Sequence, residues 1–149
     1  AVANGGTWIQ PHLMKEITHE DDNGAKVVDE TYDPNKKNVA SEDKTAELRS
    51  ALERVVTSGS ATATFIDGYH IGGKTGTAQK MENGRYIDGK YISSFVGMAP
   101  VDDPKVTIMI TVDEPSTGTY YASQVAVPYA KSLFIDIFNY STYIIIYIK

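Results

Sequence analysis

The chain has no cysteine, no long apolar run and no cluster of basic residues. The absence of cysteine excludes a disulfide scaffold, a thiolate metal site and a cysteine nucleophile. Fourteen Lys and Arg against nineteen Asp and Glu give a net charge of -5, with no run of five like charges, so we expect no nucleic-acid partner. Residues 1–6 lack the basic flank and apolar stretch of a signal peptide and do not begin with Met, which indicates an end cut from a longer protein.

What the chain does contain is an ordinary globular composition. Its 149 residues are 42% hydrophobic, which is enough for a single core. We expect an α+β fold in which helices pack on an antiparallel β-sheet. Asn-Gly at 23–24, between two strand-like runs, predicts a small exposed hairpin. Residues 32–44 are polar and show no periodicity, so we expect a surface connection there.

Two amphipathic helices are predicted. The first spans about three turns, with Arg49 on its polar side, and ends at Gly59 in a left-handed capping conformation. The second covers residues 123–138 and docks on the sheet, with Pro128 in its first turn or at a kink. The apolar face of the first helix is expected to hold Leu48, Ala51, Leu52, Val55 and Val56.

Strands are expected from residue 61 onward, where β-branched and aromatic residues accumulate. Thr62, Thr64 and Ile66 begin this stretch, and Asn-Gly at 83–84 and Asp-Gly at 88–89 should divide it by tight turns. Residues 106–112 alternate with a period of two, which places one apolar row on the core and predicts antiparallel pairing with residues 95–99. The tail 141–149 is strand-like and too short to span a bilayer.

Residues 68–79 hold the most informative motif, and they allow two interpretations. Residues 68–75 satisfy G-x-x-x-x-G-K-[ST], the phosphate loop of nucleotide-binding proteins, with Asp113 and Glu114 as the acidic end of a magnesium-holding strand. A phosphate loop must open an α-helix, however, and Gly76 and strand-like residues follow instead. The alternative is the K-T-G element of serine acyl-transferases, which lies on an edge strand that faces a cleft.

The K-T-G interpretation gives each residue a chemical use. Lys74 offers a cation, while Thr75 and Thr77 offer hydroxyl groups. Gly76 lets a bound acyl-peptide approach the backbone because no Cβ stands in the way. These features suit a substrate that ends in a carboxylate.

Three segments in this order carry a resemblance to a known family. They are residues 73–79 (G-K-T-G-T-A-Q), 94–100 (S-F-V-G-M-A-P) and 112–115 (V-D-E-P). Together they resemble the end of the transpeptidase domain of class B penicillin-binding proteins, the division and sporulation type. The likeness covers about residues 1–140, so we expect this range to be the C-terminal portion of a serine transpeptidase/β-lactamase-like domain. Residues 141–149 are then a tail of unknown role.

The resemblance implies a peptidoglycan D,D-transpeptidase that cross-links stem peptides through an acyl-serine intermediate. Lys74 then raises the local positive potential and contacts the serine of an S-x-N element. Thr75 and Thr77, with Gly76 between them, bind the carboxylate of the substrate or β-lactam. The backbone N–H of Thr77 supplies half of the oxyanion hole, and Gln79 lines the outer end of the strand. No cofactor or metal is implied.

The resemblance also implies partners and a location. The partners are peptidoglycan stem peptides ending in D-Ala-D-Ala, β-lactam antibiotics and the upstream half of the domain. The location is the extracytoplasmic face of the bacterial cell membrane, with an N-terminal anchor outside this chain.

The nucleophile and the S-x-N element are missing from the chain. S-x-x-K occurs at residues 41–44, but the family's nucleophile lies far upstream of its K-T-G strand, so we interpret the match as accidental. We expect Ser41 to act as a helix-capping or turn hydroxyl. This chain alone should therefore be inactive. The alternatives are the phosphate-loop NTPase and a non-catalytic β-lactam sensor built on the same domain.

Other candidate residues favour ordinary structural roles. His12, His19 and His70 lack the spacing of metal ligands. Asp113 and Glu114 are expected to point to opposite faces of a strand, as neighbouring residues do. The ten tyrosines suit half-buried sheet positions, and no pattern arranges them as a stacking platform.

Overall fold

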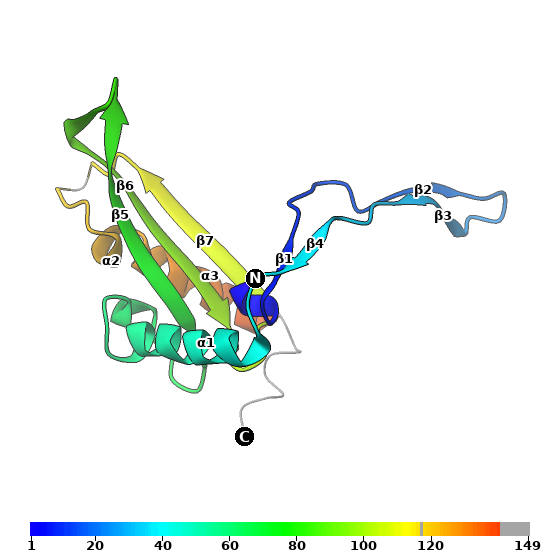
Figure 1. The fold of residues 1–149 in the computed structure, drawn as a ribbon, viewed down its shortest axis with the longest axis horizontal. Helices are drawn as coiled ribbons and strands as arrows, with labels where there is room; N and C mark the ends of the chain where they lie inside the picture. Colours follow the sequence, from blue (N-terminus) through cyan, green and yellow to red (C-terminus); the bar gives the residue numbers. More distant parts are fainter. Residues whose placement is uncertain (117, 141–149) are drawn as a thin grey trace.

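A three-stranded antiparallel sheet forms the centre of the molecule. The computed structural model describes residues 1–116 and 118–140, so the expected tail 141–149 lies outside the described residues. The sheet has the order β5 (Gly72–Glu82), β6 (Arg85–Ala99) and β7 (Val106–Asp113) (Figure 1). Residues 95–99 pair with residues 106–110, as predicted. The expected α+β class with an antiparallel sheet is confirmed.

Within the described residues, three α-helices accompany the sheet. They are α1 (Glu42–Thr57), α2 (Ala122–Val125) and α3 (Val127–Tyr140). Pro128 lies in the first turn of α3, where its missing N–H costs no helical hydrogen bond. The predicted helix over 123–138 is therefore two helices that meet at Ala126. Figure 1 shows α3 running behind the sheet, while α1 crosses the lower end of β5.

The core lies between the sheet and α3. Phe95 of β6 and Phe134 of α3 are both 0% exposed, and Phe138 joins them. Two glycines make this packing possible: a Cβ on Gly97 would lie 3.1 Å from the Phe134 ring, and one on Gly73 would lie 2.4 Å from Phe95 Cζ. Large aromatic side chains therefore fill the space that these glycines leave.

The buried face of α1 differs from the predicted one. Leu48 is 45% exposed and Ala51 is also exposed, whereas Thr45, Arg49 and Val56 are buried. Arg49 donates from Nε to the Val101 carbonyl at 2.8 Å and from Nη1 to the Val2 carbonyl at 3.1 Å. The prediction that Arg49 lies on the polar side was wrong, because a buried cation is stable where backbone carbonyls satisfy its donors.

The ends of α1 confirm one prediction and correct another. Ser41 is the N-cap, and its side chain accepts from the Lys44 backbone N–H at 3.4 Å, so the capping role is confirmed. Gly59 has no positive φ, and the helix ends at Thr57 with Ser58 as its cap. The residue must still be small, because a Cβ on Gly59 would lie 2.8 Å from Val55 Cα.

Two strand predictions need correction. Residues 62–64 form a 3₁₀ turn, η2 (Thr62–Thr64), instead of a strand. The turn at Asn83 and Gly84 is confirmed, with φ values of 50° and 76°. Gly89 has φ 72° but does not end a strand, because β6 continues through it and only the pairing register with β5 shifts. The irregular pairing at this point of β6 accommodates Gly89 with its positive φ.

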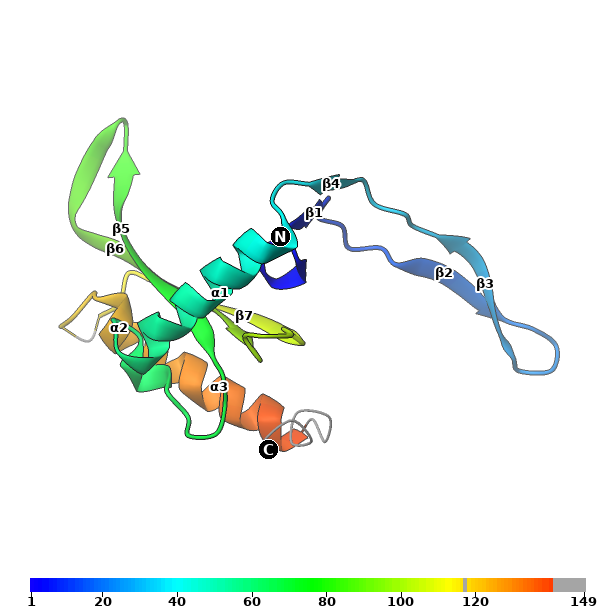
Figure 2. The ribbon, with the colours of Figure 1, turned by 60° about the horizontal axis from the view of Figure 1, so that its bottom comes forward.

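The N-terminal part forms an arm that projects from the body. After η1 (Val2–Asn4), strand β1 (Thr7–Ile9) pairs with β4 (Lys36–Asn38), and further out β2 (Glu16–Glu20) pairs with β3 (Lys26–Thr31). Figures 1 and 2 show the arm pointing away from the sheet. The predicted hairpin is confirmed. The predicted connection 32–44 is wrong in part, because it contains β4 and the first turn of α1.

Candidate active site

Strand β5 carries the K-T-G residues along the free edge of the sheet. Lys74 pairs with Val96, and Val96 pairs with Met109 on the next strand. Cross-strand partners share a face, and Val96 and Met109 are 45% and 66% exposed, so Lys74 lies on the open face. Thr75 pairs instead with the buried Phe95, which places Thr75 and Thr77 on the covered face.

The backbone groups of Thr75 and Thr77 point to the open edge of β5. The Glu114 N–H donates to the Tyr91 carbonyl at 2.9 Å, so the odd-numbered residues of β6 turn their backbone groups toward β7. The even-numbered residues of β6 then bond to the even-numbered residues of β5. The odd-numbered residues of β5 therefore turn their backbone groups away from β6, so the N–H of Thr77 makes no hydrogen bond to that strand. A second contact agrees, since Lys74 Nζ donates to the Thr75 carbonyl at 2.9 Å.

Each threonine hydroxyl has one partner from outside the sheet. Thr75 Oγ1 and Ser60 Oγ lie 2.9 Å apart, and either can donate. Thr77 Oγ1 accepts from the Ala122 backbone N–H at 3.0 Å, at the start of α2. A hydroxyl has one proton and two lone pairs, so Thr77 keeps its proton for a further acceptor. Both side chains reach the solvent at this edge.

The neighbouring residues differ in how open they are. Nothing lies within 4 Å of a Cβ built on Gly76, so the backbone there is accessible from the open face. Gln79 Nε2 donates to the Ile87 carbonyl at 3.0 Å, which directs its amide toward β6. Lys74, Thr75, Gly76 and Thr77 are therefore together and accessible, whereas Gln79 is tied to the neighbouring strand.

The phosphate-loop interpretation is wrong. Lys74 and Thr75 lie within a continuous strand that runs on to Glu82, and α1, the long helix nearest in sequence, ends before them. Without a helix that begins at Thr75, no free N-terminal amides point at a phosphate. The S-x-x-K match at 41–44 has a structural role instead, since Lys44 Nζ pairs with Glu47 at 2.9 Å on the surface of α1.

An ion cluster joins β5 to the end of β7. Lys80 Nζ lies 2.8 Å from Asp113 Oδ1 and 2.9 Å from Glu114 Oε1, and Lys90 also pairs with Glu114. The hydrogen bond that Lys80 donates to Asp113 is the main cause that raises the pKa of Lys80, while the bond from Lys90 lowers the pKa of Glu114. The prediction that the two carboxylates point to opposite faces was wrong, because Glu114 has φ 50° and leaves the strand.

The remaining candidates have structural surroundings. His19 pairs with Asp29 and His70 with Glu53, and His12 lies against Tyr32. Within residues 1–116 and 118–140, no group of three or more His, Asp or Glu side chains could hold a metal ion. Over the same described ranges, no helix has the length and apolarity needed to cross a bilayer.

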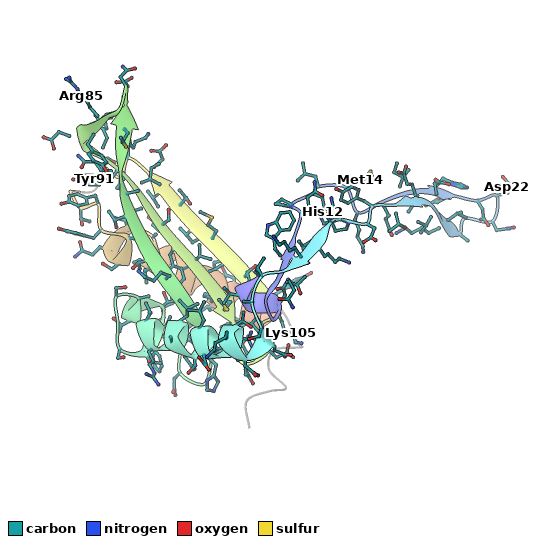
Figure 3. All side chains as sticks on the ribbon, in the orientation of Figure 1. His12, Met14, Asp22, Arg85, Tyr91 and Lys105 are labelled. Carbon is teal, nitrogen blue, oxygen red and sulfur yellow. The ribbon has the colours of Figure 1, made fainter. Side chains whose placement is uncertain are left out.

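The tyrosines are not confined to half-buried sheet positions. Tyr91 of β6 stacks on Tyr120 with ring centroids 3.9 Å apart, and Tyr120 lies against Tyr121 at 4.6 Å. Tyr91 is labelled in Figure 3, near the upper part of the sheet. The hydrogen bond between the Tyr120 and Tyr121 hydroxyls raises the pKa of Tyr121. A stacked tyrosine group therefore lies beside the K-T-G strand, contrary to the prediction.

Sequence reasoning missed the residues that hold the threonines. Ser60 and Ala122 are 15 and 45 residues from their threonine partners, and no motif contains them. Ala122 acts through its backbone N–H, which nearly every residue type has, so the sequence does not reveal this role. Lys80 was missed as well, although it lies three residues beyond Thr77 on the same strand.

Comparison with known proteins shows the family. The sequence model of the penicillin binding protein transpeptidase domain matches residues 1–134, and the chain belongs to that family. Stage V sporulation protein D from Bacillus subtilis is 39% identical over 136 residues, which are 91% of this chain and 21% of that protein. The probable peptidoglycan D,D-transpeptidase PenA from Neisseria meningitidis is 41% identical over 101 residues, covering 67% of this chain and 17% of the relative.

Solved structures agree with the fold. The transpeptidase domain of Burkholderia pseudomallei penicillin-binding protein 3 superposes with a TM-score of 0.73 at 31% identity, covering 95% of this chain and 40% of that one. Penicillin-binding protein 3 from Mycobacterium tuberculosis, complexed with ampicillin, gives 0.72 at 25% identity, covering 93% and 32%. The chain thus spans about a fifth of the curated relatives and at most two fifths of these structures.

Proposed function

We propose that this chain supplies the K-T-G strand of a peptidoglycan D,D-transpeptidase. The observation that carries the proposal is the open edge of β5, where the N–H of Thr77 and the hydroxyls of Thr75 and Thr77 gather beside Lys74. Membership of the transpeptidase family supports the same role. Several of the curated relatives, PenA among them, are named as peptidoglycan D,D-transpeptidases, which favours an enzyme over the non-catalytic sensor. Residues 1–140 form the C-terminal portion of the domain in this proposal.

The proposed reaction divides the work between two parts of one domain. A serine from the upstream part attacks the carbonyl carbon of the penultimate D-Ala of a stem peptide. The C–N bond between the two D-Ala residues breaks and the terminal D-Ala leaves. An amine of a neighbouring peptidoglycan strand then attacks the acyl-serine and takes the acyl group, which frees the serine. β-Lactams acylate the same serine. This activity places the domain outside the cytoplasmic membrane, held there by an anchor in the upstream part.

The residues of β5 have distinct roles in this scheme. The N–H of Thr77 donates to the oxyanion that develops on the attacked carbonyl, and one such donor is worth about 2.7–4 kcal/mol of transition-state stabilisation. The hydroxyls of Thr75 and Thr77 donate to the substrate carboxylate, and Lys74 adds positive potential. Gly76 keeps the open face clear for the acyl-peptide. Gln79 shapes the outer end of the strand through its bond to β6.

Labelling with a fluorescent penicillin tests this function. We expect no covalent label on the 149-residue chain, and a stable label on a longer protein that also carries the upstream S-x-x-K and S-x-N residues. Lys74→Ala in the longer protein should slow acylation severely, whereas Lys37→Ala on the arm should not change it. Label on Ser41 of the short chain, or unchanged acylation of Lys74→Ala, would contradict the proposal.

A substitution on Thr77 separates its two roles. Thr77→Ala removes the hydroxyl but keeps the backbone N–H. We therefore expect weaker binding of carboxylate-bearing substrates, with the acylation step itself less affected. Steady-state and single-turnover acylation of the longer protein measure the two separately.

A further inference from the structure

We propose that the buried Ser93 is a positioning residue for the substrate carboxylate, acting on Thr77 through residues 120–122. This inference rests on the proposed function, in which the Thr77 hydroxyl donates to that carboxylate. Ser93 lies on β6 and is 0% exposed, so it cannot meet a ligand itself. Its effect on the site passes through the short segment that its hydroxyl holds.

Ser93 and Thr77 are neighbours on two adjacent strands. They are register partners of β6 and β5. Because the even-numbered residues form the hydrogen bonds between these strands, Thr77 and Ser93 are a non-hydrogen-bonded pair, the kind whose side chains lie closest. The start of α2 lies against the same two strands (Figure 1). Two hydroxyls therefore stand side by side where the chain enters α2.

The two hydroxyls bind adjacent peptide groups of one segment. Ser93 Oγ donates to the Tyr120 carbonyl. The Ala122 N–H donates to Thr77 Oγ1 at 3.0 Å. Only the φ of -69° and the ψ of 126° at Tyr121 lie between these two peptide groups. The bond from Ser93 therefore restricts the direction in which the Ala122 N–H points.

Packing around the segment does not fix that direction. Tyr91 stacks on Tyr120 with planes 8° apart, and a stacked ring can still slide or turn within its plane. The Ala122 side chain is 1% exposed and belongs to the core, which fixes its Cβ but not the rotation of the peptide group before it. A hydrogen bond is directional, so Ser93 supplies the restraint that these contacts lack.

The direction of the Ala122 N–H determines what the Thr77 hydroxyl can donate. Ala122 is the first residue of α2, where an N–H has no partner within the helix and needs an acceptor from outside. Thr77 Oγ1 is that acceptor, which leaves the single proton of its hydroxyl for the carboxylate at the open edge. Without Ser93, the Ala122 N–H points away more often, and the Thr77 hydroxyl loses the contact that orients it.

Amide hydrogen exchange on the 149-residue chain tests the structural half of the inference. We expect Ser93→Ala to speed exchange of the Ala122 amide several-fold, because its bond to Thr77 opens more often. Ser93→Cys keeps a weaker donor, so an intermediate rate would support the inference. Unchanged exchange of Ala122 in Ser93→Ala would overturn it.

Ser132→Ala is the matched control for this experiment. Ser132 also donates its hydroxyl to a backbone carbonyl, that of Pro128, but it does so on the exposed side of α3. Its loss should leave the exchange of Ala122 as it is. Equal acceleration in Ser132→Ala and Ser93→Ala would mean that any lost serine bond loosens Ala122, and this would contradict a specific role of Ser93.

Acylation of the longer protein tests the functional half. We expect Ser93→Ala to lower the rate of acylation by benzylpenicillin about tenfold, near the lower limit for losing one hydrogen bond to a charged group. Acylation by the methyl ester of benzylpenicillin should fall less than about twofold, because the ester lacks the charged carboxylate to which Thr77 donates. Equal losses for both compounds would indicate a general structural defect and would overturn the inference.

A double substitution separates action through Thr77 from any other action of Ser93. Once Thr77→Ala has removed the hydroxyl, adding Ser93→Ala should lower acylation by benzylpenicillin less than about twofold further, because the group that Ser93 positions is gone. A further loss of about tenfold would show that Ser93 acts by another route, against the inference.

Failure of the proposed function gives a different result. If the unsubstituted longer protein is acylated by neither compound, the transpeptidase role is wrong, and the carboxylate part of the inference is wrong with it. The exchange of Ala122 in the 149-residue chain decides separately whether Ser93 directs its N–H to Thr77.

Discussion

The body and the arm of this molecule use the same antiparallel pairing with different results. Strands β5, β6 and β7 cover a core in which Phe95 and Phe134 are fully buried. Strands β2 and β3 form a hairpin whose residues are exposed, apart from the half-buried Glu16. Figure 3 shows the arm with Met14 and Asp22 along it, standing clear of the sheet.

The difference teaches that pairing alone does not make a stable unit. A two-stranded hairpin is at best marginally stable in water, because its hydrogen bonds replace equally good ones to solvent. The sheet of the body gains most of its stability from the apolar area that α3 covers. We therefore expect the body to carry the free energy of unfolding and the arm to open locally at little cost.

The largest expected effect comes from removing a core ring. Phe134→Ala should lower the free energy of unfolding by about 3–5 kcal/mol, because it loses buried area and leaves a cavity beside Phe95. Ile17→Ala in the arm, where the side chain is 46% exposed, should change it by less than about 0.5 kcal/mol. Urea denaturation of the chain measures both. Similar losses in the two variants would remove the contrast between body and arm.

Two glycines of β5 give the next effect. A Cβ on Gly73 meets Phe95 Cζ at 2.4 Å, so Gly73→Ala should cost about 1–3 kcal/mol through overpacking. Gly76→Ala is the matched control, since nothing lies within 4 Å of its Cβ, and we expect it to be near neutral for stability. Thermal unfolding distinguishes the two. In the proposed enzyme, Gly76→Ala should nevertheless slow acylation, because the added methyl stands where the acyl-peptide lies.

Arg49 tests the join between the two regions. It bonds the Val101 carbonyl in the body and the Val2 carbonyl just before the arm. Arg49→Met should cost about 2 kcal/mol, because hydrogen bonds from a charged group are lost and carbonyls are left without donors. Hydrogen exchange should rise in η1 and β1 more than in β6. If β6 responds as strongly as η1, the arm and the body unfold together.

The smallest expected effect is a pH response confined to the arm. The hydrogen bond from Lys26 lowers the pKa of Glu16 below its ordinary value of 4.5, and backbone N–H groups of Ala25 and Asn23 lower the pKa of Asp21. Depressed carboxyl pKa values give a contribution that is present above the ordinary pKa and is lost as the pH falls through the lowered value. NMR signals of β2 and β3 should therefore shift as the pH falls below the ordinary range of the carboxyl pKa values.

The matched variant for this response is Glu16→Gln. It removes the titrating group from the Lys26 contact, so the shift in β2 should shrink while that near Asp21 remains. Signals of β6 and α3 serve as the internal reference. A response of equal size in those elements would show that the acid transition belongs to the body.

Local patterns in the sequence were enough to predict several elements. The turns at 23–24 and 83–84 follow from Asn-Gly, which tolerates positive φ. The alternation of 106–112 predicted a half-buried strand, and Ser41 was recognisable as a cap. The strand context of Lys74 followed from Gly76 and the residues after it. Each of these depends on interactions within a few residues.

The wrong predictions share a different cause. Arg49 was placed on the polar side of its helix because it is charged. Only the carbonyl groups of Val101 and Val2, which are distant in the sequence, make its burial favourable. Gly59 looked like a left-handed cap, but the close backbone of Val55 explains why it is small. Asp113 and Glu114 looked like opposite faces of a strand until a turn brought both to Lys80.

The sequence by itself determined which chemical groups the K-T-G strand offers: a cation, two hydroxyls and a glycine in a fixed order. The tertiary structure decided how those groups are presented. The order of strands leaves the N–H of Thr77 on a free edge, and the approach of Ala122 engages one lone pair of its hydroxyl. The physical reason is that hydrogen bonds are directional and depend on atoms from distant segments, which residue types along one strand do not specify.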